Sequence, residues 1–140
     1  MDSQKVNGGR ALAASLAAQG VTTIFTVSGG GLSAFYAACP DNGIRVVHNR
    51  HEYGAIFMAD GWARTTGEPG VCVTTLGPGL TNVITGMLSA TMGAVPMVVI
   101  SSCTPVANWD LGTGQGFEHL PLVRPVSKYS KTVHDANRIP

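Results

Sequence analysis

The chain has 140 residues, a length that suits one domain, and a formal net charge of +1 at pH 7. This charge balance and the lack of a basic run exclude nucleic acid and anionic membrane surfaces as expected partners, and no stretch reaches the roughly 18 apolar residues of a membrane span. Charged residues make up only 12% of the chain and hydrophobic ones 44%, so we expect another domain or subunit to cover part of its surface.

Helical and strand patterns alternate along most of the chain. Helices are expected over residues 8–19, 32–38, 51–66 and about 80–92, and strands over residues 21–27, 44–48, 70–75 and 97–102. The strands are apolar without alternation, which is typical of strands covered on both faces. The pattern predicts an α/β fold: a doubly wound, mostly parallel sheet with helices on both faces.

The pattern weakens after residue 103. A glycine-rich loop covers residues 111–117, and a last strand is expected near residues 130–133. Residues 134–140 are typical of a helix start, with Asp135 or Asn137 as the cap and Pro140 in the first turn. We therefore expect a single domain over residues 1–140, truncated before its last helix.

The residue with the clearest chemical potential is Glu52, which follows the strand 44–48. If Asn49 caps the helix, Glu52 is its third residue and can close a capping box, a purely structural role. The small residues Gly54, Ala55 and Ala59 also allow a ligand to approach, and a carboxylate in an apolar crevice can share a proton with a weakly basic ring nitrogen. Both interpretations stay open on this pattern alone.

A second unusual run, Gly77-Pro-Gly-Leu-Thr-Asn82, follows the strand 70–75. A strand-to-helix turn needs one glycine, and a second one indicates a close approach of the backbone. Ligands of open α/β sheets bind at the carboxyl ends of strands, so the run predicts a small-molecule site. An ordinary tight turn is the alternative.

Other motifs carry less weight. Residues 29–34 match G-x-G-x-x-A, which leaves a Rossmann-like nucleotide-binding module as an alternative, whereas Ser28 lacks the first glycine of a nucleophile elbow. The three cysteines and four histidines have no metal-ligand spacing, so no metal ligand is predicted in this chain. Cysteines with apolar neighbours favour reduced thiols and a cytoplasmic protein.

Taken together, these runs resemble the N-terminal pyrimidine-binding (Pyr) domain of thiamine diphosphate-dependent enzymes, in the acetolactate synthase-like group. The matching runs are Gly9-Arg-Ala-Leu12, Gly20-Val21, Ile24-Phe25-Thr-Val27, His51-Glu52, Ala55, Met58-Ala-Asp-Gly61, Ala63-Arg64, Thr66-Gly67-Glu-Pro-Gly-Val71, Gly77-Pro-Gly79, Thr81-Asn82, Gly86 and Val95-Pro-Met-Val-Val-Ile100. The resemblance spans almost the whole chain, and the pairing of His-Glu with Gly-Pro-Gly-x-Thr-Asn is its most specific part.

The resemblance implies a reaction that cleaves or joins carbon–carbon bonds next to a carbonyl, as in a 2-keto acid decarboxylase or carboligase. Glu52 would hydrogen-bond N1′ of the aminopyrimidine and so activate the cofactor for proton loss at C2 of its thiazolium ring. Gly29, Pro78 and Asn82 would lie at the cofactor, and Gln115 is similar to the family's active-site glutamine. Three residues depart from common family patterns: Ser28 replaces proline, Gly114 phenylalanine and Gly93 an acidic residue.

The resemblance also implies what must be supplied from elsewhere. The family's magnesium–diphosphate motif, GDG followed by paired asparagines, does not occur in these 140 residues and belongs to a separate domain. We therefore expect a diphosphate-binding domain or subunit that carries Mg²⁺, assembly as a homodimer or homotetramer, and a small 2-keto acid or acyl-CoA type substrate. The binding of FAD is left open, and so is a non-catalytic or separate-subunit Pyr domain.

Overall fold

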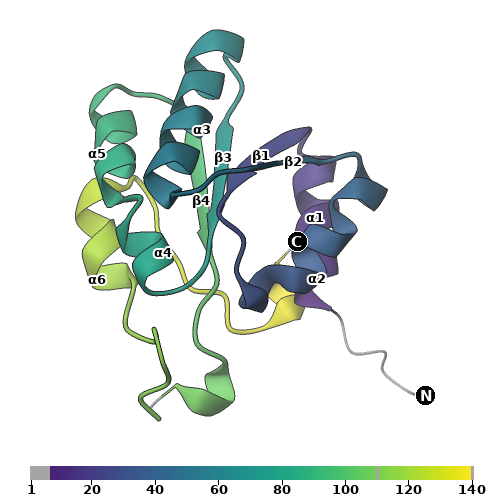
Figure 1. Cartoon of the computed structure of the whole chain (residues 1–140), viewed down its shortest axis with the longest axis vertical. Helices are drawn as coiled ribbons and strands as arrows, with labels where there is room; N and C mark the ends of the chain where they lie inside the picture. Colours follow the sequence, from purple (N-terminus) through teal and green to yellow (C-terminus); the bar gives the residue numbers. More distant parts are fainter. Residues whose placement is uncertain (1–6, 110, 140) are drawn as a thin grey trace.

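A parallel sheet of four strands forms the centre of the molecule, in the order β2-β1-β3-β4 (Figure 1). The computed structural model describes residues 7–109 and 111–139. The strands are β1 (Thr23–Thr26), β2 (Arg45–His48), β3 (Gly70–Thr74) and β4 (Met97–Ser101). All four lie within the predicted ranges, and the sheet confirms the expected α/β fold.

Helices cover both faces of the sheet. The α-helices are α1 (Gly8–Ala18), α2 (Ser33–Ala38), α3 (Glu52–Thr66), α4 (Pro78–Thr81), α5 (Ile84–Met92) and α6 (Leu120–Val123). Short 3₁₀ turns are η1 (Gly30–Leu32), η2 (Pro40–Asn42), η3 (Val106–Asn108), η4 (Arg124–Val126) and η5 (Ala136–Arg138). Helices α1 and α2 lie on one side of the sheet, whereas α3 and α5 pack together on the other (Figure 1). No helix of the described residues is long and apolar enough to cross a bilayer.

Two separate cores explain why the strands are apolar without alternation. Phe25 and Cys72 point to the side of α3 and α5, where they pack with Ile56. Ile24 and Val71 point to the side of α1 and α2. Because successive residues of a strand face opposite sides, a sheet buried on both faces needs apolar residues at every position.

The predicted helix over residues 80–92 is wrong as one continuous element. It is divided into α4 and α5, with Asn82 and Val83 in a turn between them. No glycine or proline marks this break in the sequence, so the propensity of the segment favoured continuity. The break orients the side chain of Asn82, whose contact is described below.

The strand predicted near residues 130–133 is also wrong: these residues form no strand. The segment leaves η4 and runs to the side of α1, where Ile139 comes within 3.3 Å of the Cβ position of Gly8. An extended segment forms a strand only where a sheet edge is available for pairing, and this segment follows another path. Asp135 caps η5 by accepting a hydrogen bond from the amide of Asn137 (2.9 Å), so the cap is Asp135 and not Asn137. The predicted role of Pro140 lies outside the described residues.

Candidate functional site at the carboxyl edge of the sheet

The predicted site residues follow the carboxyl ends of all four strands. Gly29 comes after β1, Glu52 after β2, Pro78 and Asn82 after β3, and Gln115 lies in the long connection after β4. Because the strands are parallel, these connections start from the same edge of the sheet. The fold therefore gathers segments that lie far apart in the sequence, from Gly29 to Gln115, on one edge.

Glu52 is the first residue of α3 and does not close a capping box. The cap of α3 is His51, whose Nδ1 accepts a hydrogen bond from the amide of Tyr53 (3.1 Å). Asn49 instead donates its backbone amide to the carbonyl of Thr26 (2.7 Å). A capping box needs the glutamate at the third helical position, so the expected cap at Asn49 and the structural role of Glu52 derived from it are wrong.

The side chain of Glu52 is held by Asn82. Asn82 Nδ2 donates a hydrogen bond to Oε2 of Glu52 over 3.0 Å, which joins α3 to the turn between α4 and α5. Glu52 is half-buried, and within the described residues its other oxygen, Oε1, has no hydrogen-bond partner. A hydrogen bond to a charged acceptor is stronger than one between neutral groups, so Asn82 fixes the orientation of the carboxylate. One oxygen is oriented and the other is available to a ligand.

The thiol of Cys72 in β3, which is influenced by the charge of Glu52, is itself uncharged at neutral pH. Cys72 is fully buried in β3, and burial, followed by the negative charge of Glu52, raises the pKa of its thiol to about 12. The thiol therefore stays protonated at neutral pH and is no nucleophile. Thr74 is fully buried two residues further along β3, and its hydroxyl has no hydrogen-bond partner among the described residues.

The glycines of the edge make room for other parts of the chain. Thr75 lies between Gly29 and Gly79: a Cβ at Gly29 would lie 2.6 Å from Thr75 Cβ, and one at Gly79 would lie 2.7 Å from Thr75 Cγ2. The second glycine of the Gly-Pro-Gly run does mark a close approach, as predicted, and the approaching group is a threonine side chain. Pro78 is exposed in the first turn of α4.

Gly77 contacts the loop that carries Gln115. Gly77 has φ +64° and ψ −122°, and a Cβ there would lie 2.4 Å from the carbonyl oxygen of Gln115. Gln115 itself has a positive φ of 67° and is exposed. Its backbone therefore reaches the turn, but among the described residues its side chain makes no hydrogen bond to Glu52 or Asn82.

The hydrogen bond between His119 and Gly77 was not predicted from the sequence. Its Nε2 accepts the backbone N–H of Gly77 over 3.1 Å, although the two residues lie 42 positions apart. Desolvation by burial lowers the pKa of His119. No spacing or motif signalled this contact, because it depends on how the loop after β4 folds back.

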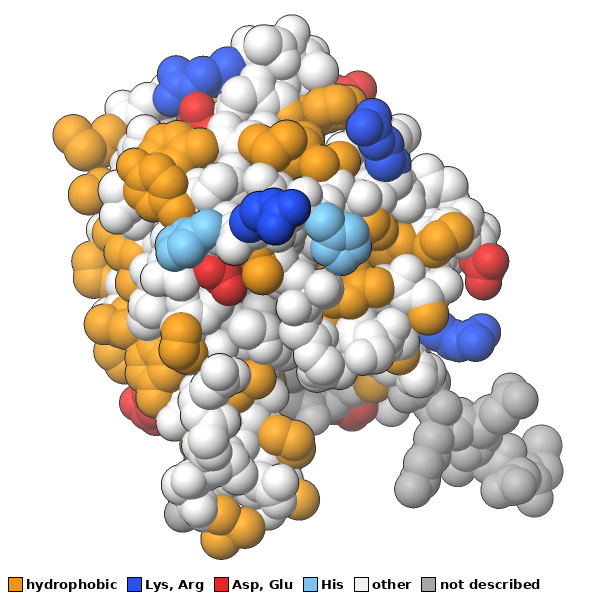
Figure 2. Space-filling view, viewed as in Figure 1, with side chains coloured by type: hydrophobic (Ala, Val, Ile, Leu, Met, Phe, Trp, Pro, Cys, Tyr) orange, Lys and Arg blue, Asp and Glu red, His pale blue; other side chains and the backbone are white. Residues whose placement is uncertain are grey.

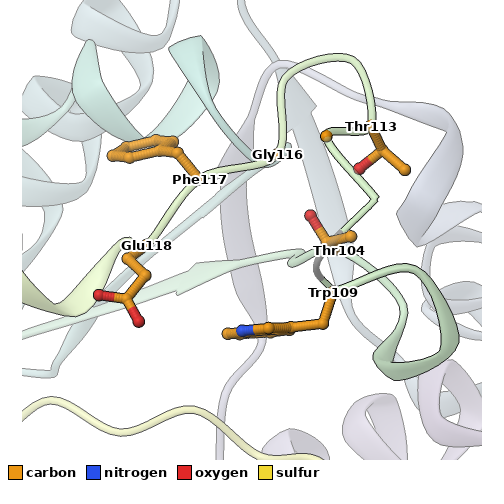
Figure 3. A pocket seen from close by; sticks show the side chains of 7 residues that line it. Thr104, Trp109, Thr113, Gly116, Phe117 and Glu118 are labelled. Atoms are coloured by element: carbon orange, nitrogen blue, oxygen red, sulfur yellow. The ribbon is translucent and has the colours of Figure 1, made fainter.

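A cavity of about 210 Å³ lies beside the Gln115 loop. Its lining side chains include Thr104, Trp109, Thr113, Phe117 and Glu118, all from the connection after β4 (Figure 3). Neither Glu52 nor Asn82 lines it. Within residues 7–109 and 111–139, no group of three His, Cys, Asp or Glu side chains is arranged to hold a metal ion.

Comparison with known proteins identifies the family. The model of the thiamine pyrophosphate enzyme N-terminal TPP binding domain matches residues 6–122. The chain belongs to this family. Thiamine pyrophosphate is the same molecule as thiamine diphosphate, so the match confirms the resemblance and the expected cofactor, and it disfavours the nucleotide-binding module.

The proteins that are similar to this TPP-binding domain are named for different activities. A probable acetolactate synthase of Mycobacterium bovis is 40% identical over 133 residues, which are 95% of this chain and 24% of that protein. The 2-hydroxyacyl-CoA lyase 2 of Homo sapiens is 41% identical, covering 91% of this chain and 20% of the lyase. A probable 2-ketoarginine decarboxylase of Pseudomonas aeruginosa is 40% identical, covering 100% of this chain and 26% of that protein. The chain thus spans about a quarter or less of the length of these relatives.

Proposed function

We propose that the complete protein containing this chain is a thiamine diphosphate-dependent enzyme that cleaves or joins carbon–carbon bonds next to a carbonyl. The observation that carries the proposal is the Glu52 carboxylate, which Asn82 holds through one oxygen while the other is left without a partner among the described residues. The names of the relatives, a synthase, a lyase and a decarboxylase, support this reaction class and not one substrate within it.

The residues at the edge fit an aminopyrimidine ring. In the proposed complex, Oε1 of Glu52 would hold the proton shared with ring nitrogen N1′, while Asn82 would keep the carboxylate from rotating. Gly54 lies in the first turn of α3, and a Cβ there would lie 3.2 Å from Oδ1 of Asn49, so this glycine lets the connection after β2 pack closely against the helix. When bound, thiamine diphosphate supplies the carbanion chemistry, and the protein supplies the orientation and the proton.

Three other residues complete the proposed contact surface. Pro78 precedes Asn82 by one turn and presents an exposed ring at the same edge. Gly29 packs its backbone against the side chain of Thr75, and we assign this backbone to the cofactor-facing surface. Gln115 is assigned as the glutamine that faces substrate, since its loop already contacts Gly77 at the turn. The contact between Gly77 and the Gln115 carbonyl oxygen supports the position of the loop at this edge. The contact of the Gln115 side chain with substrate is proposed.

The diphosphate and Mg²⁺ are assigned to a domain or subunit outside this chain, because the described residues offer no cluster of metal ligands. An apolar part of the surface suits contact with such a partner. Hydrophobic side chains gather over α5 and α6 (Figure 2), where Leu88, Met92 and Leu122 are exposed. We further propose a homodimer or homotetramer, a small 2-keto acid or acyl-CoA type substrate, and a cytoplasmic location; FAD binding is left open. Submicromolar binding of thiamine diphosphate by the isolated chain would contradict this division of the site.

The substitution Glu52→Gln in the full-length protein tests the proposal. The amide keeps the shape of the side chain but cannot hold the N1′ proton in the same way. We expect hydrogen–deuterium exchange at C2 of bound thiamine diphosphate, followed by proton NMR, to slow by at least about 100-fold, corresponding to about 3 kcal/mol of transition-state stabilisation. An unchanged melting temperature serves as the control for folding. Full exchange and turnover in the variant would favour the non-catalytic Pyr domain instead.

A further inference from the structure

The imidazole of His119 lies where the separate parts of the proposed site meet. His119 immediately precedes α6 and is half-buried, and its Nε2 accepts the amide hydrogen of Gly77 over 3.1 Å. The ring of Phe117 packs edge-on against the imidazole, with 4.8 Å between the ring centroids. Gly77 ends the connection after β3 and is the N-cap residue of α4. One side chain of the loop after β4 therefore holds the turn that follows β3.

The position of Gly77 determines where Asn82 lies. The carbonyl of Gly77 accepts hydrogen bonds from Leu80 (3.0 Å) and Thr81 (3.1 Å), which form the single turn of α4. Asn82 follows this turn directly and donates to Glu52. A displacement of Gly77 would thus be carried through a four-residue helix to the amide that orients the carboxylate.

Gly77 also determines where the Gln115 loop lies. The carbonyl oxygen of Gln115 occupies the space that a side chain at Gly77 would fill, 2.4 Å from the Cβ position. His119 belongs to the same loop, four residues further on. The hydrogen bond from Gly77 to His119 therefore closes the loop against the turn and keeps these backbones in contact.

The contact requires a neutral imidazole. A nitrogen that accepts an N–H hydrogen bond carries no proton, so the proton of His119 resides on Nδ1. Glu118 and Arg124 are the charged residues nearest to His119 in the sequence, and α3 carries Glu52, Asp60 and Arg64. Within the described residues none of them forms an ion pair with His119. Burial is the cause that lowers the pKa of the ring, which favours the accepting form at neutral pH.

We propose that His119 is a positioning residue of the thiamine diphosphate site: it holds Gly77 and, through Gly77, aligns both the Asn82–Glu52 pair and the Gln115 loop. The inference rests on the proposed function, because it assigns a task to that same site. His119 touches neither Glu52 nor the proposed ligand position, so its effect is carried entirely by the main chain of the turn.

Two substitutions in the full-length protein separate the hydrogen bond from the imidazole itself. His119→Gln retains an acceptor at nearly the same reach but does not titrate, whereas His119→Leu retains the bulk without an acceptor. We expect His119→Leu to weaken thiamine diphosphate binding roughly tenfold, as measured by calorimetry with Mg²⁺ present, and His119→Gln to restore most of it. His134→Gln is the matched control, since His134 is exposed and contacts only the Trp109 ring among the described aromatic pairs.

The pH dependence of kcat/KM separates the hydrogen bond of His119 from a role in packing alone, because a side chain that only fills space would not contribute to it. In the wild type, activity should decline on the acid side as His119 becomes protonated, and His119→Gln should lose that part of the decline. Proton–nitrogen NMR of the unliganded wild type should show a neutral His119 with its proton on Nδ1 at pH 7. A protonated ring or an Nε2–H tautomer would overturn the proposal, even where the leucine variant fails to fold.

The outcomes also distinguish this inference from the proposed function. A wild-type protein that binds no thiamine diphosphate would overturn the proposed function and, with it, the role of His119. Wild-type binding that is equally tight in His119→Leu would overturn the role of His119 alone. An identical acid limb in the wild type and His119→Gln would do the same.

Discussion

The side-chain amide of Asn82 donates a hydrogen bond to Oε2 of Glu52 over 3.0 Å, although 30 positions separate the two residues in the chain. The bond connects the start of α3 to the turn between α4 and α5. Within the described residues no group of α3 donates a hydrogen bond to the Glu52 carboxylate, and Asn82 is the donor that restricts its rotation. The carboxylate is thus oriented by a neighbouring connection and not by its own helix.

Replacing Asn82 by alanine should reduce activity without preventing folding. The substitution removes the donor and leaves Glu52 free to rotate, which we expect to cost about 1 to 2 kcal/mol of transition-state stabilisation, or roughly a five- to thirtyfold lower kcat/KM. Steady-state kinetics of the full-length protein measure this. Thr81→Ala is the control, because among the described residues the Thr81 hydroxyl donates only to the carbonyl of Pro78 in its own turn (3.1 Å). Equal losses in both variants would show that the effect comes from α4 and not from Glu52.

The substitution Gly77→Ala should destabilise the protein strongly. Gly77 combines φ +64° with ψ −122°, and an added Cβ would meet the Gln115 carbonyl oxygen at 2.4 Å. We expect a loss of at least about 2 kcal/mol in the free energy of unfolding, measured with urea.

Gly112→Ala is the comparison variant for this loss. Gly112 also has a positive φ, 59°, but nothing lies within 4 Å of its Cβ position. Its substitution should cost only about 1 kcal/mol, the usual conformational penalty. A loss in Gly77→Ala no larger than that in Gly112→Ala would contradict the expected clash with the Gln115 carbonyl oxygen.

Acid should weaken the part of the stability that comes from His119. Burial lowers the pKa of His119 in the folded protein, whereas the unfolded chain titrates near 6.5. The neutral imidazole therefore contributes its full stabilisation above about pH 6.5, and the contribution declines as the pH falls below that value and through the lower folded-state pKa. Urea unfolding at several pH values between about 7.5 and 5 should show a smaller acid loss in His119→Gln than in the wild type. A larger loss in the variant would contradict this sign.

Thiol labelling should distinguish the cysteines of the chain. The fully buried Cys72 has a thiol pKa raised to about 12, mainly by desolvation. Four pH units below that value only about one thiol in ten thousand is ionised, so we expect negligible alkylation of Cys72 at pH 8. Cys103 is partly exposed and should react first, as followed by peptide mapping. Rapid labelling of Cys72 in the folded protein would mean that the sheet below Glu52 is open to solvent.

Much of the fold was predictable because strand composition is a local property. β3 is a good example: Val71, Cys72 and Val73 are buried on alternate faces, and the unbroken apolar run carried that information. The same reasoning failed for residues 130–133, since whether a short extended segment pairs depends on which sheet edge it reaches.

The candidate site was predictable in its residues but not in its contacts. Glu52 and Asn82 stood out by motif, yet their mutual hydrogen bond depends on a helix break that no glycine or proline marks. Asn49 was one candidate for the cap of α3 because asparagine is a common capping residue, whereas histidine is not, although Nδ1 of His51 fulfils the role. His119 had no local signal, because its partner Gly77 lies 42 positions away.

Thr75, whose side chain lies between Gly29 and Gly79, limits which residues these three positions can carry in evolution. A bulkier residue at Thr75 would push apart the connections after β1 and β3 at once, and neither glycine could accept a side chain while the threonine remains. Alanine at position 75 would release Gly79, whose close contact is with Cγ2 of Thr75, but only glycine would release Gly29, whose contact includes Cβ. Among homologues, we therefore expect these three positions to covary, with a larger residue at 79 only alongside alanine or glycine at 75, and a larger residue at 29 only alongside glycine at 75.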